Sequence, residues 1–166
     1  MTIRLAAQTI EFKASEDEWA AGTTYENEYV GITIPAKTLG GYREDEAKGW
    51  EIVQWSLAHI FDHLQELTAK SNRILFALQQ EIFRSDYLKE KCRFDLYAIV
   101  IKSVQTINVD QPYVNFELEF SHTCDATTFI DDIYYDYSCG YNISSGDRIT
   151  LNFARRLGSC DDFDSV

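Results

Sequence analysis

The central third of this 166-residue chain constrains its fold most, because a helical period runs through it without interruption. From Ala47 to about Lys91 there is no proline, and there is no glycine after Gly49. Apolar residues recur at helical spacing in two stripes, first Trp50, Val53, Leu57, Ile60, Leu64 and Leu67, then Ile74, Leu75, Leu78 and Ile82. Polar residues 68–72 predict a break, so we expect two helices or one kinked helix.

The segment before the helices alternates with the period of a strand. In residues 28–36, Val30, Ile32 and Ile34 face one way, and Pro35 ends the run. In residues 3–12 the apolar register shifts near Gln8, which predicts a bulge or a turn there. We expect residues 15–28 to form a polar connection with at most one helical turn, and residues 40–46 to form a loop.

The segment after the helices returns to period two. Residues 94–101 are apolar on both faces, which is typical of a strand in the middle of a sheet. Residues 114–120 and 149–154 alternate, and the turn residues 145–147 precede the second of these runs. The sequence therefore predicts an α+β fold. It is an antiparallel sheet of about five to six strands, with one or two central helices packed on one face, in the order β-β-α(α)-β-β-β-β.

The length of the chain, its N-terminal sequence and the spacing of its cysteines indicate the number of domains and the cellular compartment. We expect a single domain over residues 1–157 and an acidic, flexible tail over residues 158–166. The N-terminus lacks the basic start and apolar run of a secretory signal, so we expect a cytoplasmic protein unless a processed signal has been removed. No cysteine forms a C-x-x-C pair, which favours free thiols over a zinc site or disulfides at Cys92, Cys124, Cys139 and Cys160.

The charge balance bears on possible partners. Asp and Glu total 27 and Lys and Arg total 15, which gives a formal net charge of −12. Such a field repels nucleic-acid phosphates and anionic lipids, and it speeds encounter with basic protein surfaces. We therefore expect a basic protein partner, and neither direct nucleic-acid binding nor membrane binding. The same charge is also explained by solubility alone.

A tyrosine- and aspartate-rich segment is the strongest candidate for a contact surface. Four tyrosines and three aspartates fall within the eleven residues 131–141. Carboxylates pair with Arg and Lys, and tyrosines supply rigid apolar contact. An edge strand with solvated hydroxyls would explain the same pattern. The expected contacts are Asp131, Asp132, Tyr134, Tyr135, Asp136 and Tyr137, with Glu44, Asp45 and Glu46 from an acidic loop.

Two histidines four residues apart offer an enzymatic alternative. The segment His59-Ile60-Phe61-Asp62-His63 resembles the H-x-x-E-H pattern of inverted zinc metallopeptidases, with Asp62 in place of the catalytic glutamate. Glu66 and Glu90 are candidates for a third ligand, and the sequence does not choose one. The same pair fits two ordinary histidines on a helix surface. Neither a common phosphate-binding loop nor a nucleophile elbow is found, so we expect a protein that is not an enzyme and needs no cofactor.

In size and charge the chain resembles bacterial immunity proteins and phage-encoded inhibitors of nucleic-acid-handling enzymes. That resemblance implies an acidic protein that occludes the basic surface of a nuclease, a toxin or a CRISPR effector. The metal-dependent hydrolase that uses His59 and His63 is the first alternative. A structural or assembly subunit, whose exposed aromatic strand pairs with its own copies, is the second.

Overall fold

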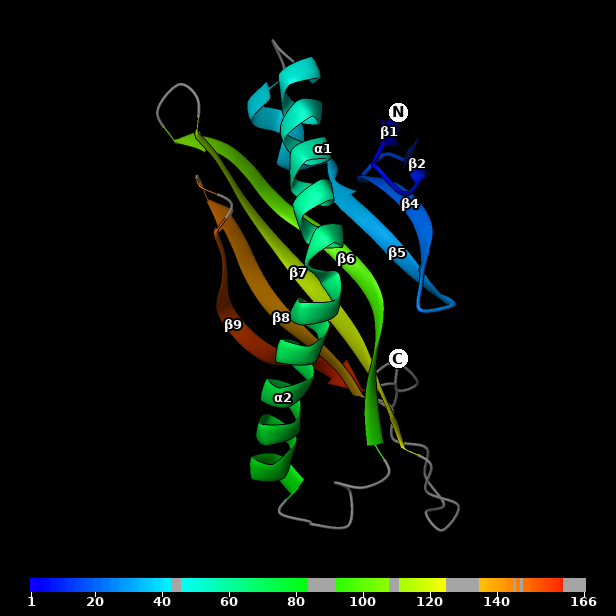
Figure 1. Ribbon diagram of the computed structural model, residues 1–166, viewed down its shortest axis with the longest axis vertical. Coiled ribbons are helices and arrows are strands. Elements are labelled where there is room, and N and C mark those ends of the chain that lie inside the picture. Colours follow the sequence, from blue (N-terminus) through cyan, green and yellow to red (C-terminus); the bar gives the residue numbers. More distant parts are fainter. Residues whose placement is uncertain are drawn as a thin grey trace.

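Two consecutive helices cross one face of a seven-stranded sheet in the computed structural model of the chain (Figure 1). The structure describes residues 1–42, 46–83, 92–107, 111–124, 135–144, 146 and 148–159. Its elements are β1 (Thr2–Arg4), β2 (Thr9–Glu11), β3 (Lys13–Ala14), β4 (Glu18–Tyr25), β5 (Glu28–Pro35), the 3-10 helix η1 (Ala36–Tyr42), α1 (Glu46–Asp62), α2 (Leu64–Phe83), β6 (Cys92–Ile107), β7 (Gln111–Cys124), β8 (Tyr135–Ser144) and β9 (Arg148–Ser159).

The strand order confirms the α+β class and corrects the predicted sheet. The strands lie in the order β3-β4-β5-β6-β7-β8-β9, while β1 and β2 form a separate hairpin. The main sheet has seven strands where we expected five to six. Its neighbours are antiparallel except for β5 and β6, which pair in parallel. The parallel pair arises because η1, α1 and α2 form a crossover between two adjacent strands. The four strands after the helices form the predicted antiparallel meander.

The central stretch forms two helices, as expected, but they meet at His63. The His63 backbone N–H is shared between the carbonyls of His59, at 3.2 Å, and Ile60, at 3.3 Å. The predicted break at residues 68–72 is wrong because polar side chains there bond within the helix or to the sheet. Thr68 donates to the Leu64 carbonyl at 2.7 Å. The Ser71 hydroxyl lies 2.7 Å from the Tyr141 hydroxyl and so ties α2 to β8.

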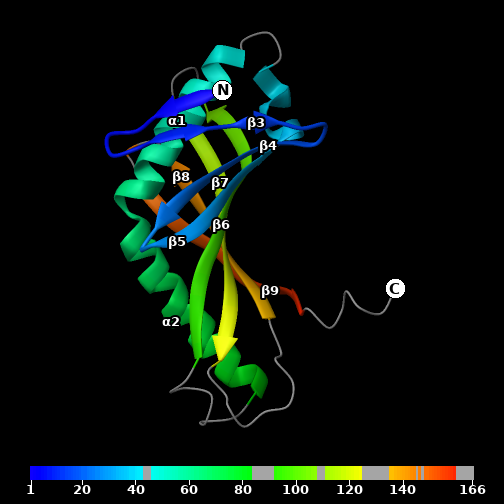
Figure 2. The same ribbon diagram turned by 90° about the vertical axis from the view of Figure 1, so that its right-hand side faces the viewer.

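The core lies between the helices and one face of the sheet, with both helices on the same side of the strands (Figure 2). Every residue of the first predicted helical stripe is buried there. From the sheet, alternate residues of β5 and β7 face them, among them Ile32, Phe116 and Leu118. As predicted, the 94–101 segment lies in the middle of the sheet, because β6 is the central strand of the seven.

The strand β4 was missed by the sequence interpretation, which gave residues 15–28 to a polar connection. Trp19, Ala21 and Tyr25 pack against the core from alternate positions of this strand. The β4–β5 hairpin turns through Glu26 and Asn27, whose φ angles are +50° and +70°. Two consecutive positive φ angles indicate a type I′ turn, which usually carries glycine. The sequence interpretation missed this hairpin because its turn contains no glycine and because β4 has little apolar character.

The predicted turn near Gln8 is confirmed. The Leu5 N–H donates to the Gln8 carbonyl at 2.8 Å, and β1 and β2 pair on either side of the turn. At the other end of the chain, residues 158 and 159 belong to β9, so the strand runs two residues past the predicted domain boundary. The rest of the predicted tail, residues 160–166, lies outside the described residues. Cys139 is a buried free thiol, as expected.

Candidate functional site

Most of the predicted contact residues lie outside the part of the chain that the structure describes. These are Glu44, Asp45, Asp131, Asp132 and Tyr134. Tyr135 begins β8, where only its backbone is described. Glu46 is the exposed first residue of α1, where its carboxylate accepts a hydrogen bond from the Trp50 indole at 3.2 Å. The acidic loop and the Tyr/Asp segment therefore stay predictions.

Tyr137 and Asp136 fall on opposite faces of β8, because successive strand residues alternate. Tyr137 is fully buried, and its ring lies edge-on to Phe94 with centroids 5.2 Å apart. The prediction of Tyr137 as a partner contact is therefore wrong, since it supplies core packing instead. Asp136 is half-buried on the side of the sheet that the helices leave uncovered.

We call that side the helix-free face. Adjacent strands bring its side chains into cross-strand rows. In one row, Glu119 of β7 lies opposite Ser138 of β8, which lies opposite Arg155 of β9. The face is defined by Tyr97, Lys102, Glu117, Glu119, Asp136, Ser138, Phe153 and Arg155. Its charged groups come from the four consecutive strands β6, β7, β8 and β9.

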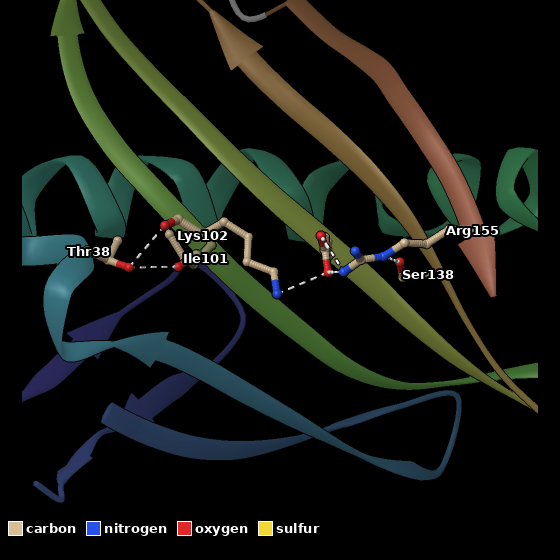
Figure 3. A network of polar contacts seen from close by, with 6 residues as sticks. Thr38, Ile101, Lys102, Ser138 and Arg155 are labelled. Carbon is tan, nitrogen blue, oxygen red and sulfur yellow. Dashed lines mark hydrogen bonds and ion pairs between the residues drawn. The ribbon is translucent and has the colours of Figure 1, made fainter. Parts of the chain in front are cut away.

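A buried carboxylate stands at the centre of the helix-free face. Glu117 is only 5% exposed. Lys102 Nζ lies 3.1 Å from its carboxylate, and Arg155 Nη2 lies 3.4 Å from it. The Arg155 Nε–H also donates to the Ser138 hydroxyl at 3.3 Å. Figure 3 shows Lys102 and Arg155 on the near side of the strands, with the helices behind. The two cations thus offset the burial of one carboxylate.

A bulge in β6 and a threonine from η1 position Lys102. The pairing of β6 with β7 shifts between Ile101 and Ser103, so Lys102 is the extra residue. The Thr38 hydroxyl binds the carbonyls of Ile101 and Lys102 at 3.3 and 3.1 Å, and Thr38 is 7% exposed. These contacts, drawn in Figure 3, hold the bulge where the Lys102 side chain reaches Glu117.

Two other acids of the helix-free face, Glu119 and Asp136, have a different environment from Glu117. Burial raises the pKa of the Glu119 carboxyl, and the Lys102 charge opposes this effect. Burial raises the pKa of Asp136 and of the Tyr97 phenol as well. The Tyr97 hydroxyl hydrogen-bonds to Glu119. Neither Glu119 nor Asp136 forms an ion pair with a described residue, because Lys102 and Arg155 both contact Glu117.

The predicted histidine pair lies at the junction of the two helices. The Nδ1 atoms of His59 and His63 lie 2.9 and 3.0 Å from the backbone carbonyls of Trp55 and His59. The His59 ring also packs against Trp55, with centroids 4.6 Å apart. Within the described ranges, no group of three or more His, Cys, Asp or Glu side chains is placed to hold a metal ion. Glu90 lies outside these ranges.

Sequence reasoning missed the central residues of this face, although part of their signal was visible. The alternation of residues 114–120 predicted one wet face, and Glu117 and Glu119 lie on it. Nothing in the sequence indicated that Lys102 and Arg155 meet at Glu117. These three residues come together only through the register of β6, β7, β8 and β9.

The fold and this face define the class of the molecule, a two-layer α+β domain in which the described helices, α1 and α2, cover one face of the sheet. Comparison with protein-family models, with curated proteins and with solved structures finds no match to this chain. None of the helices described here is long and apolar enough to cross a membrane.

Proposed function

We propose that this domain is an acidic protein-binding inhibitor, and that it docks its helix-free face on the basic surface of a nucleic-acid-handling enzyme or toxin. The partner would be a nuclease, a toxin or a CRISPR effector. Carboxylates of the domain would take the place of nucleic-acid phosphates, so that binding occludes the partner's groove. The net charge of −12 would speed the encounter of the two proteins.

The observation that carries this proposal is the pair of half-buried acids Glu119 and Asp136. Both carboxyls have raised pKa values because burial disfavours their charged forms. Neither has a cation of its own among the described residues, so their charge costs stability in the free domain. An arginine from a partner could contact both carboxylates and recover that cost. Groups whose pKa is perturbed on an accessible surface are candidates for function for this reason.

The two alternatives have less support. For the hydrolase, one nitrogen of each histidine lies at hydrogen-bond distance from a backbone carbonyl, and no observation in the described residues adds a third ligand. For the assembly subunit, β9 is an edge strand, and its pairing with β8 is interrupted twice by register shifts. It also carries Arg148, Arg155 and Arg156. Bulges and charged residues on an edge strand disfavour pairing with another strand.

The proposal is tested by capture of a partner from a lysate of the native host, with three versions of the domain as bait. The wild type should retain a basic protein that elutes at high salt. The E119Q/D136N variant should lose it. The matched control E26Q/E28Q removes two exposed acids from the β4–β5 turn and should retain it. Equal capture by all three baits would place the contact elsewhere and overturn the use of this face.

A further inference from the structure

The helix-free face carries an exposed aromatic ring beside its charges. Phe153 of β9 is 40% exposed. Its ring lies over Gly140 of β8, so close that a Cβ at Gly140 would come within 2.2 Å of it. The Arg155 guanidinium lies 5.4 Å from the centre of the same ring. An exposed phenylalanine next to a partly exposed arginine is typical of the centre of a protein interface.

The charges of this face are arranged so that the face is complementary to itself. Glu119 and Arg155 lie in one cross-strand row, on β7 and β9, with Ser138 of β8 between them. Consider two copies whose helix-free faces meet and are related by a two-fold axis that runs parallel to β8, midway between the two sheets. In this arrangement β7 of each copy lies opposite β9 of the other. The arrangement therefore places Arg155 of one copy opposite Glu119 of the other, twice. In an isologous interface, such reciprocal contacts are required.

The same axis brings small residues and the aromatic rings to the centre. Ser138 and Gly140 of β8 lie on the axis, where small side chains let the two sheets approach. The Phe153 rings lean over Gly140 from both copies and would meet there. Sheets that pack face to face are separated by about 10 Å, a distance that facing Arg and Glu side chains can span. The result is an apolar centre with an ion pair on each side.

We propose that two copies of this chain pack their helix-free faces together about a two-fold axis along β8. Arg155 of each copy contacts Glu119 of the other, and the two Phe153 rings form the centre. The inference rests on the proposed use of this face for protein binding, and it adds a regulatory step. The dimer covers the face, so a basic partner must displace the second copy.

Substitution of Asp136 distinguishes the proposed dimer from the complex with a basic partner, because it should affect the two in opposite directions. Asp136 lies on β8 two residues from Ser138, and the axis brings it near Asp136 of the other copy. Two like charges that face each other weaken an interface. Asp136→Asn should therefore tighten the dimer, although the same change should weaken capture of a basic partner.

The test is sedimentation of the purified protein over about a hundredfold range of concentration, because a dimer responds to concentration by mass action. The wild type should form a dimer. Phe153→Ala and Arg155→Gln should each raise the dissociation constant at least about tenfold, which corresponds to loss of one good interfacial contact. Arg148→Gln, an arginine at the start of the same strand, is the control and should leave the dimer unchanged.

A charge exchange then tests the proposed pairing. Glu119→Lys and Arg155→Glu should each be monomeric alone, and a mixture of the two should form a heterodimer. If either charge-reversal variant fails to fold, the neutral variants and Phe153→Ala still decide the result. A wild type that stays monomeric at all concentrations overturns the dimer and leaves the proposed function intact. A dimer unaffected by Phe153→Ala and Arg155→Gln overturns this interface.

Discussion

Lys102 and Glu117 form a 3.1 Å ion pair in which the side chain of the cation is 40% exposed and that of the carboxylate only 6%. Arg155 of β9, whose side chain is 51% exposed, approaches the same carboxylate from the other side, across β8. The two cations can be solvated without their partner, whereas Glu117 cannot. Loss of the carboxylate and loss of the cations should therefore have unequal effects on stability.

Glu117→Gln should lower the free energy of unfolding by about 1 kcal/mol, because it leaves two cations that water can solvate. The double variant Lys102→Met and Arg155→Met should lower it by about 3 kcal/mol, because it leaves a buried carboxylate without a cation. Methionine keeps the apolar stem at both positions. Urea unfolding measures both values, and equal losses would contradict the asymmetry.

Thr38→Val should destabilise the domain by about 1–2 kcal/mol, since it removes a buried hydroxyl that binds two carbonyls at the β6 bulge. Valine keeps the shape of the side chain. Thr24→Val, at an exposed position of β4, is the matched control and should change stability by less than about 0.5 kcal/mol. Chemical denaturation of both variants gives the comparison. A loss no greater than that of the control would show that the bulge forms without Thr38.

The double variant E119Q/D136N should stabilise the free domain at neutral pH. The raised pKa values mean that the folded state holds these protons more tightly than the unfolded state. Their contribution therefore destabilises the domain increasingly as pH rises from the ordinary carboxyl range near 4 toward neutrality. The gain in stability from E119Q/D136N should be larger at pH 7 than at pH 4. E26Q/E28Q makes the same change in net charge and should not reproduce this pH dependence.

His122 should make the domain sensitive to mild acid. Its ring is stacked on Phe94 with centroids 5.0 Å apart, and burial lowers its pKa below the ordinary 6.5. The unfolded chain therefore takes up a proton before the folded domain does, and stability falls as pH decreases through 6.5.

The measurement that isolates this effect compares wild type with His122→Phe between pH 8 and pH 5. The contribution of one histidine has a limiting slope of about 1.4 kcal/mol per pH unit. The difference in unfolding free energy should be constant near pH 8 and should move in favour of His122→Phe as pH falls. A difference that stays constant down to pH 5 would contradict the shift. Glu119 and Asp136 act in the opposite direction, and both proteins in the comparison contain them.

Helices and strands could be predicted from the sequence where the burial of a regular apolar pattern determined the structure. The helical stripe from Trp50 to Leu67 is buried throughout, because an apolar face of that length has to be covered. The 94–101 segment, which is apolar on both sides, lies in the central strand as expected. The prediction failed for β4, where half-polar residues form a strand only because they pair with β5 and pack on Trp50.

The candidate site was less accessible to sequence reasoning. Asp136 was predicted as a contact and does lie on the helix-free face, but its neighbour Tyr137 is in the core. A tyrosine on a strand fits either face, and only the register with β7 decides between them. Residues far apart in the chain, Lys102, Glu117 and Arg155, meet for the same reason.

The sequence by itself determined the class of the fold, the two helices, the central strand and the net charge. These follow from composition and from apolar periodicities of 3.6 and 2 residues, which are visible within a single helix or strand. The tertiary structure decided the parallel pairing of β5 with β6, the burial of Tyr137 and the ion pairs at Glu117. Each of these depends on strand order and register, which are set by contacts between distant segments.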